Sequence, residues 1–221
     1  MHPAIADLLT VLFPQENACH LCARSAQFGV LCSRCYEQLG QQELPLNMRC
    51  LSRADDLRAS IACWRHRGVA RRLVHHLKYS TDPRAAIVLA EGMLRALHTE
   101  EMDSCIDLIV PVPLHAEREK KRGYNQAALL AQELSTGSGI AMRQDVLFRT
   151  RFTDTLVDLD RKGRLQMMRG AFAVANPAAI AQKRILLVDD VFTTGATAQA
   201  CAEALKGAAA AEVYVITACR A

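Results

Sequence analysis

Continuous runs of apolar residues predict the strands of this chain. Residues 184–188 carry one basic residue followed by an aliphatic run, and residues 106–110 and 212–218 have the same character. Apolar strands without alternation are typical of parallel sheets that are covered by helices on both faces. We therefore predict an α/β protein in which these segments are buried strands of a parallel sheet.

Apolar positions spaced three and four residues apart predict the helices. Residues 70–78 and 85–97 each form such a stripe, and a third helix is expected to open after the turn at residues 193–197. The inward positions of the third helix would be Ala198, Cys201, Ala202 and Leu205. The strands and helices therefore alternate along the chain.

A boundary near residue 48 divides the chain into two predicted domains. Residues 1–48 hold a short helix over 4–12, which Pro14 stops, and a cysteine-rich segment. Residues 49–221 hold the predicted sheet, and residues 41–60 are polar enough to be the connection. The apolar N-terminal run is interrupted by Asp7 and is too short to span a bilayer, so we expect a cytoplasmic protein.

Composition and charge exclude few classes of function. The 221 residues are 51% hydrophobic and 23% charged, which is ordinary for a globular protein, and the net charge of +4 permits anionic ligands without requiring nucleic acid. Residues 61–84 concentrate six Lys and Arg against one acid. This block is expected to be a solvated helix face or a surface for phosphates.

Four of the nine cysteines are spaced as metal ligands. Cys19 and Cys22 form one C-x-x-C pair, and Cys32 and Cys35 form a second pair after nine intervening residues. Two such pairs supply four thiolates for a tetrahedral zinc, whereas a redox site uses a single pair. We expect a structural zinc knuckle, and free buried thiols for the scattered cysteines.

The turn after residues 184–188 carries the candidate binding chemistry. Asp189 and Asp190 follow the strand, and the next helix begins after Thr193-Thr194-Gly195-Ala196-Thr197. A helix N-terminus with hydroxyl donors binds phosphate, while two carboxylates repel it and suit sugar hydroxyls or a divalent cation. This combination indicates a ribose 5-phosphate site, and the absence of Gly-x-x-x-x-Gly-Lys excludes a Walker loop.

A second strand, loop and helix should bring basic side chains to the same edge. The loop after residues 106–110 contains Pro111, Pro113 and four basic residues, and parallel strands present their carboxyl ends together. The basic residues are Arg118, Lys120, Lys121 and Arg122. They would meet anionic oxygen atoms or form a solvated turn.

Two segments resemble a known family. LLVDDVFTTGATA resembles the phosphoribosyl diphosphate (PRPP) loop of type I phosphoribosyltransferases, and VPVPLHAEREKKRGYNQ resembles the signature of their ComF/GntX branch, which is associated with natural competence and DNA uptake. Lys78-Tyr79 matches that branch's Lys-Tyr, and these features follow the family order over nearly the whole chain. The resemblance implies a type I phosphoribosyltransferase-like sheet flanked by helices and preceded by a zinc knuckle.

The resemblance also implies roles for individual residues. Asp189 and Asp190 would hold the ribose hydroxyls, and the residues from Thr193 to Thr197 the 5-phosphate. The Val112-Pro113-Leu114 turn, with Mg²⁺, would hold the pyrophosphate. Arg118 or Arg122 would assist it, and Lys78 would belong to the PRPP site.

Residues 148–172 resemble the flexible loop of the family. Arg149, Thr153 and Arg164 match it, and the mixed charge suits a lid that excludes water. Leu156 and Met167 stand where the family commonly has Gln and Asn, which weakens the expectation of turnover more than that of binding.

Two classes of function remain open at this point. One is a PRPP-binding phosphoribosyltransferase, for which no general base can be named. The other is a competence module that keeps the pocket as a sensor or relic and binds single-stranded DNA or the uptake machinery. A DNA groove would need stacking aromatic residues, and these make up only 5% of the chain.

Overall fold

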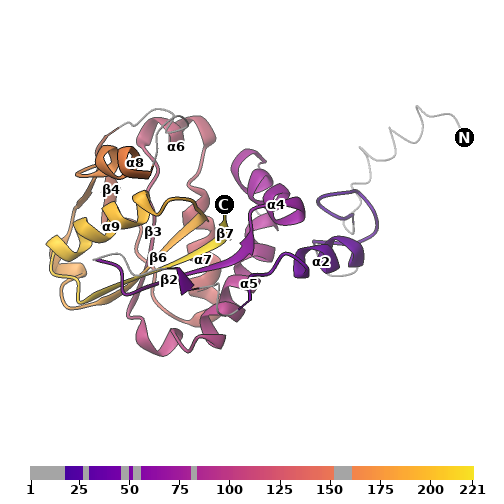
Figure 1. Cartoon of the computed structure of the whole chain (residues 1–221), viewed down its shortest axis with the longest axis horizontal. Helices are drawn as coiled ribbons and strands as arrows, with labels where there is room; N and C mark the ends of the chain where they lie inside the picture. Colours follow the sequence, from indigo (N-terminus) through magenta and orange to yellow (C-terminus); the bar gives the residue numbers. More distant parts are fainter. Residues whose placement is uncertain (1–17, 27–29, 46–49, 52–55, 81–83, 152–160) are drawn as a thin grey trace, which may run out of the picture.

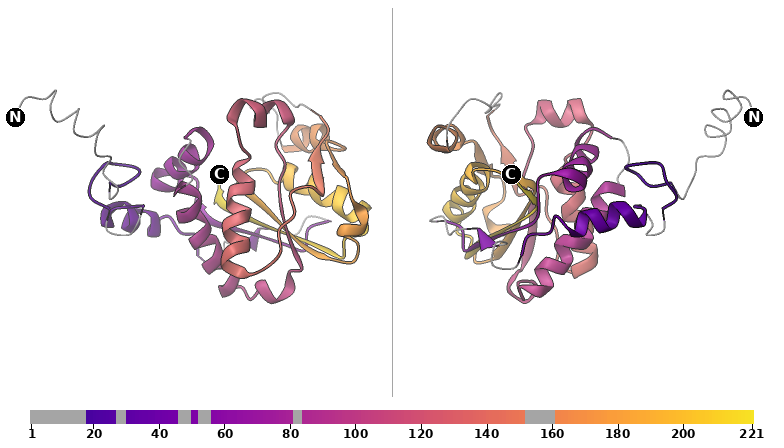
Figure 2. Two further views of the ribbon diagram at one scale, coloured as in Figure 1. Left: turned by 180° about the vertical axis from the view of Figure 1, so that it is seen from behind. Right: turned by 45° about the vertical axis from the view of Figure 1, so that its right-hand side comes forward.

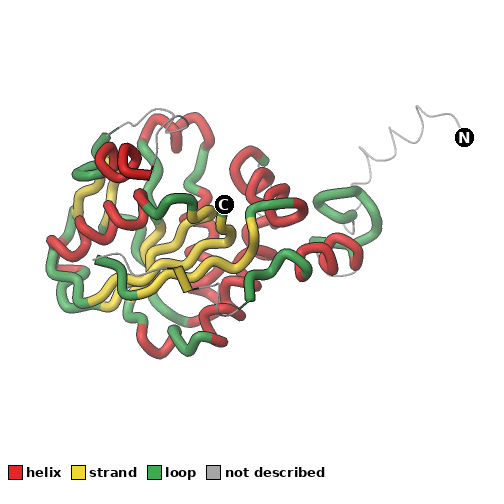
Figure 3. The backbone as a smooth tube through the Cα atoms, viewed as in Figure 1, coloured by secondary structure: helices red, strands yellow, loops and turns green. Residues whose placement is uncertain are grey.

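The computed structural model describes residues 18–26, 30–45, 50–51, 56–80, 84–151 and 161–221. The helix predicted over residues 4–12 lies outside this part of the chain. A central sheet is surrounded by helices, and the cysteine-rich segment lies at one end of the long axis, next to α4 (Figures 1 and 3). The predicted α/β class, with a parallel sheet flanked by helices and four clustered cysteines, is confirmed.

The sheet has the strand order β1-β2-β7-β6-β3. Its members are β1 (Cys50–Leu51), β2 (Ala59–Arg65), β7 (Glu212–Arg220), β6 (Arg184–Phe192) and β3 (Leu108–Pro111). β1 pairs antiparallel with β2, and all the other pairs are parallel. The three predicted strands are present, with β6 and β7 longer than expected and β3 beginning two residues later.

The strand β2 was missed by the sequence reasoning, which placed its residues in a connection and a basic block. Residues 60–64 are buried, and β2 pairs with β7 from Ala59 to Arg65. The run is only five residues long and ends in Arg65. Its strand character is therefore decided by the long-range pairing with β7 rather than by its local pattern.

Helices cover the two faces of the sheet separately. One face packs against α4 (Gly68–Tyr79), α5 (Arg84–Thr99) and α7 (Gln126–Ser138). The other face packs against α9 (Ala196–Gly207), whose predicted inward stripe is buried. The rear and rotated views in Figure 2 show the same division. Alternation along β6 sends Ile185 and Leu187 to the α9 side and Leu186 and Val188 to the other.

The segment 148–172 contains regular elements, so it is not one continuous loop. β4 (Leu147–Arg149) pairs antiparallel with β5 (Phe172–Val174), and α8 (Arg161–Met168) lies between them in the sequence. Residues 152–160, which include Thr153 and Leu156, lie outside the described residues. The predicted lid function stays a prediction.

The loop after β3 also contains a helix, α6 (Ala116–Arg122), where a basic turn was expected. His115 accepts a hydrogen bond from the Glu117 N–H at its start, and Gly123, with a φ of 87°, ends it. Two short 3₁₀ helices lie elsewhere in the described part of the chain: Asp103–Cys105 precedes β3, and Pro177–Ala179 precedes β6. No helix in the described part of the chain is long and apolar enough to cross a bilayer.

The cysteine-rich segment packs on the main core. Its helix α2 (Ser33–Gly40) buries Cys35 and Leu39, and these residues share one hydrophobic cluster with Trp64 and Leu73. The side chain of Gln42, which follows α2, accepts a hydrogen bond of 3.0 Å from the Ala70 N–H at the start of α4. The predicted domain boundary at residues 48/49 stays a prediction.

Candidate functional site

The two acidic residues lie inside β6, on opposite faces of the sheet. β6 continues to Phe192 because β7 pairs with it as far as Arg220, so the acids do not follow the strand as predicted. Side chains alternate along a strand, which directs Asp189 toward the α9 side and Asp190 toward the α4 and α7 side. The two neighbouring carboxylates therefore have different surroundings.

Asp189 shares a small cleft with the threonine-rich turn. The cleft is lined by Asp189, Val191, Phe192, Thr193, Gly195, Thr197, Ala198, Val215 and Thr217. Gly195 has a φ of 81° and precedes α9 directly, and an added Cβ would lie 2.8 Å from the Phe192 ring. Thr193 is exposed and Thr194 and Thr197 are half-buried. The N-terminus of α9, with no acidic residue in its first turn, therefore faces the cleft that contains Asp189.

The environment of Asp189 disfavours its charged form. Burial and the neighbouring Asp190 carboxylate raise its pKa well above the usual range, and Lys78 opposes this shift. Asp189 Oδ1 accepts a hydrogen bond of 2.8 Å from the Asp190 N–H. An unpaired charge on this carboxyl group is therefore unfavourable, and a hydroxyl donor or a cation beside it would stabilise the ionised form.

Asp190 is almost fully buried and is held by two protein side chains. Lys78 Nζ, at the end of α4, lies 2.5 Å from Asp190 Oδ2. Gln126 Nε2, at the start of α7, donates to Asp190 Oδ1 at 3.3 Å. Gln126 Oε1 in turn accepts a hydrogen bond from Arg122. Asp190 therefore connects the sheet to two helices.

Basic side chains gather in a pocket next to Asp190, here called the basic pocket. It has a volume of about 490 Å³ and is lined by Lys78, Tyr79, Ser80, Arg118, Lys121, Arg122 and Tyr124. The Arg122 guanidinium carbon lies 5.6 Å from the centre of the Tyr79 ring, which is 70% exposed. The structure therefore brings together Lys78, Arg118 and Arg122, which the family resemblance assigns to one site, and their role in binding anions stays a prediction.

The RGYNQ segment builds the walls of this site. The Tyr124 hydroxyl lies 2.8 Å from Leu77 O and 2.6 Å from Ser80 O, which anchors the end of α4. Asn125 accepts a hydrogen bond from the Ala127 N–H at the start of α7 and donates to Val112 O at 3.1 Å. Sequence reasoning missed these roles, although an Asn before an apolar helix is a recognisable capping signal.

The Val112–Leu114 turn is engaged mostly with the protein itself. Val112 donates its N–H to Val188 O at 2.9 Å, and its carbonyl accepts the Asn125 hydrogen bond. Pro113 has no N–H to offer. Two of the three residues predicted to hold pyrophosphate therefore present no free backbone donor.

Burial and neighbouring charges shift the pKa values of Arg149 and His66. Burial and Arg118 lower the pKa of Arg149, while Cys201 and Asp189 oppose this shift. Burial, Lys78 and Arg71 lower the pKa of His66, which follows the missed strand β2. Arg164 belongs to α8, and its side chain is outside the described part of the structure.

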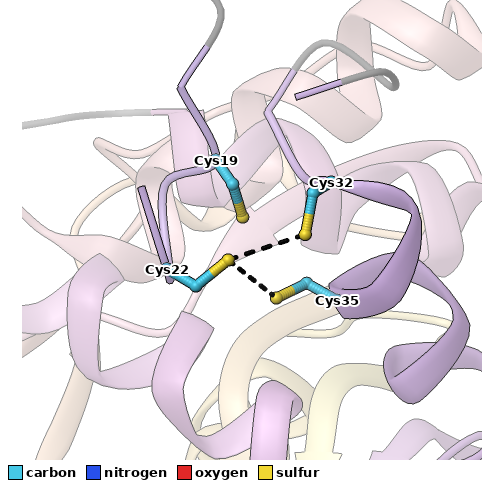
Figure 4. Close-up of side chains that lie close together, drawn as sticks. All are labelled: Cys19, Cys22, Cys32 and Cys35. Carbon is cyan, nitrogen blue, oxygen red and sulfur yellow. Dashed lines mark hydrogen bonds between the residues drawn. The ribbon is translucent and has the colours of Figure 1, made fainter. Parts of the chain in front are cut away.

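The four predicted metal ligands lie together (Figure 4). The sulfur atoms of Cys19, Cys22, Cys32 and Cys35 all lie within 4.8 Å of one another. Burial and the three neighbouring thiols raise the pKa of Cys35 to about 12. Backbone hydrogen bonds outweigh burial to lower that of Cys19 to about 6. Four crowded thiols of this kind cannot all ionise without a cation, and a tetrahedral thiolate set suits zinc.

The fold and these sites define an α/β protein with a parallel sheet, a threonine turn beside a buried acid pair, and a tetracysteine module. The DNA utilization protein YhgH of Salmonella typhi is 32% identical over 206 residues, which cover 91% of this chain and 89% of the relative. Competence protein F of Haemophilus influenzae is 37% identical over 110 residues, which cover 49% of this chain and 48% of the relative. The chain belongs to the ComF/GntX family, as its motifs predict.

Phosphoribosyltransferases are among the solved structures that resemble this chain. Adenine phosphoribosyltransferase from Leishmania tarentolae matches 77% of this chain and 94% of its own length, with 13% identity and a TM-score of 0.42. No family model matches the chain.

Proposed function

We propose that this protein binds PRPP at the carboxyl edge of its sheet. The observation that carries the proposal is the joint placement of Asp189, the Thr193–Thr197 turn and the α9 N-terminus around one cleft, beside the basic pocket. The 5-phosphate would accept hydrogen bonds from the turn and the first N–H groups of α9. The ribose hydroxyls would reach Asp189 and Asp190.

The basic pocket is the proposed place for the diphosphate. Lys78, Arg118 and Arg122 supply positive charge, whereas the Val112–Leu114 turn, the predicted site, uses its Val112 N–H and carbonyl within the protein. Mg²⁺ would accompany the diphosphate and offset part of its charge. The diphosphate and the 5-phosphate would then lie on either side of β6.

The reaction class that suits this arrangement is phosphoribosyl transfer. Positive charge would develop at the ribose C1 while pyrophosphate departs, and the basic pocket would stabilise the leaving diphosphate. Arg149, whose pKa is shifted by the charges of both Arg118 and Asp189, would add positive charge to the site. The residues of this chain would therefore contribute binding, orientation and electrostatic stabilisation.

Titration calorimetry with PRPP and Mg²⁺ tests the proposal. We expect the wild-type protein to give a binding signal and the double variant Asp189→Asn with Asp190→Asn to lose it. Asp145→Asn is the matched control, because Asp145 is an exposed carboxylate that pairs with Arg143 outside the site. Equal binding by the double variant and the control would remove the assignment.

Single-stranded DNA is a second candidate ligand, favoured by one feature of the basic pocket. Tyr79 is 70% exposed and lies against Arg122, so a base could stack on its ring while phosphates meet the cations. The name of the Salmonella relative refers to DNA utilization.

A salt titration separates the two ligands. Oligonucleotide affinity should fall steeply between low and physiological salt, and Tyr79→Ala should weaken it by about 1–3 kcal/mol. Charge reversal at the exposed Arg71 should weaken it further. Failure of the wild-type protein to bind an oligonucleotide at low salt would rule this candidate out.

A further inference from the structure

Both carboxylate oxygens of Asp190 are already engaged within the protein. Oδ2 lies 2.5 Å from Lys78 Nζ, and Oδ1 accepts the amide hydrogen bond of Gln126 at 3.3 Å. The Asp190 side chain is only 6% exposed. Each oxygen has a further lone pair, but burial closes the approach, so a sugar hydroxyl reaches this carboxylate only if one of the two partners moves.

Of the two partners, Lys78 is the one whose side chain can move away from Asp190. Its side chain is 27% exposed and lines the basic pocket with Arg118, Lys121 and Arg122. Gln126, in contrast, is buried and is also tied to Arg122. A lysine has a long flexible stem, so its ammonium group can turn from Asp190 to an anion in the pocket.

The main chain on either side of Lys78 is fixed. The Tyr124 hydroxyl contacts Leu77 O and Ser80 O, and Ser80 N–H donates to His76 O at 2.8 Å. The movement that would release Asp190 is therefore confined to the Lys78 side chain and does not require α4 to shift.

We infer that Lys78 makes the site selective for sugar phosphates that carry a diphosphate, because an anion in the basic pocket must draw Lys78 away before Asp190 accepts a ribose hydroxyl. This inference rests on the proposed PRPP site. A ribose 5-phosphate without a diphosphate has nothing to offer Lys78, so it would have to compete with the ion pair. Two ligand parts on opposite faces of β6 are thereby coupled through one side chain.

The coupling is measurable with two separate small molecules. Titration calorimetry in Mg²⁺ gives the affinity for ribose 5-phosphate, first alone and then with inorganic pyrophosphate present. For the wild-type protein we expect pyrophosphate to tighten the binding of ribose 5-phosphate at least about fivefold, in the range typical of coupled sites. In Lys78→Gln we expect tighter binding of ribose 5-phosphate alone than in wild type, and no enhancement by pyrophosphate.

Lys121→Gln is the matched control, because Lys121 lines the same pocket and does not pair with Asp190. It should weaken pyrophosphate binding and keep the enhancement at saturating pyrophosphate. The inference is overturned if pyrophosphate leaves the wild-type affinity unchanged, or if Lys78→Gln retains the enhancement, even when PRPP binds normally. The wild-type arm alone decides if Lys78→Gln does not fold. Absence of ribose 5-phosphate binding in both conditions, together with absence of PRPP binding, would remove the proposed function as well.

Discussion

In the described part of the protein, two clusters of crowded ionisable groups differ in the source of the positive charge that could offset them. In the tetracysteine module, four thiols lie within 4.8 Å of one another and the neighbours push the pKa of Cys35 up to about 12. On β6, burial and the neighbouring Asp190 raise the pKa of Asp189. The four thiols could hold a metal ion from outside the chain, whereas Asp190 pairs with a cation of the chain itself, Lys78.

The difference teaches which sites a sequence can reveal. All four thiols lie between residues 19 and 35, so their spacing alone indicates a metal site. The partners of Asp190 come from α4 and α7, which are distant in the sequence. Folding is needed to bring Lys78 and Gln126 to this carboxylate.

The largest expected effect comes from removing the metal that the tetracysteine module is proposed to hold. The module buries Leu31 and Leu39 in the main core, so its loss should loosen that contact. We expect a strong chelator, or Cys35→Ser, to lower Tm by about 10 °C, since 1 kcal/mol shifts Tm by about 2–4 °C at this size.

Metal analysis and thermal unfolding check this prediction together. Cys105→Ser is the control, because Cys105 is half-buried outside the cluster. A protein that carries no zinc when purified, or that has the same Tm after chelation, would contradict the claim that the four cysteines hold a metal ion.

The next largest effect should follow from removing Asp190. Asp190→Ala leaves the ammonium group of Lys78 without its carboxylate in a largely buried place, and we expect a loss of about 2–4 kcal/mol in the free energy of unfolding. The double variant with Lys78→Met should recover part of this loss, because removing both charges leaves neither unpaired. Denaturant unfolding that shows no difference between Asp190→Ala and Asp145→Ala would break the claim of an internal ion pair.

A smaller effect of opposite sign is expected at Asp189. Asp189→Asn replaces a carboxyl group whose ionisation the cleft disfavours with a neutral amide, so we expect it to raise the free energy of unfolding by about 0.5–2 kcal/mol while PRPP binding is lost. Residues of a binding site commonly lower the stability of the folded protein. Destabilisation by Asp189→Asn would show that the Asp189 carboxylate is favourably paired in the folded protein.

The pH dependence of stability tests independently whether the Asp189 carboxylate destabilises the folded protein. Because the pKa of Asp189 is raised on folding, the folded protein keeps a proton that the unfolded chain has lost. The contribution of Asp189 to stability is therefore greatest below its unfolded pKa and falls as the pH rises toward the folded value. Unfolding free energies of wild type minus Asp189→Asn, measured across this range, should show that decline, and a flat difference would contradict it.

Local patterns predicted the parts of the fold whose signal is continuous in the sequence. The aliphatic run before Asp189, the helical stripe at Ala70 to Leu77 and the cysteine spacing all gave the correct elements. β2 was missed because its five buried residues become a strand only through β7. The placement of Asp189 and Asp190 on opposite faces of the sheet was missed because it depends on β6 extending past both residues. Two consecutive acids are typical of a turn and did not indicate that the strand continues.

The structure of a complex with PRPP and Mg²⁺ tests the central claim most directly. We predict that the 5-phosphate lies at the N-terminus of α9 against Thr194 and Thr197, with a ribose hydroxyl on Asp189. Lys78 Nζ should then be turned from Asp190 toward the diphosphate in the basic pocket. A complex in which the sugar phosphate lies away from the α9 turn would contradict the site, and one in which Lys78 still pairs with Asp190 beside bound diphosphate would contradict the coupling.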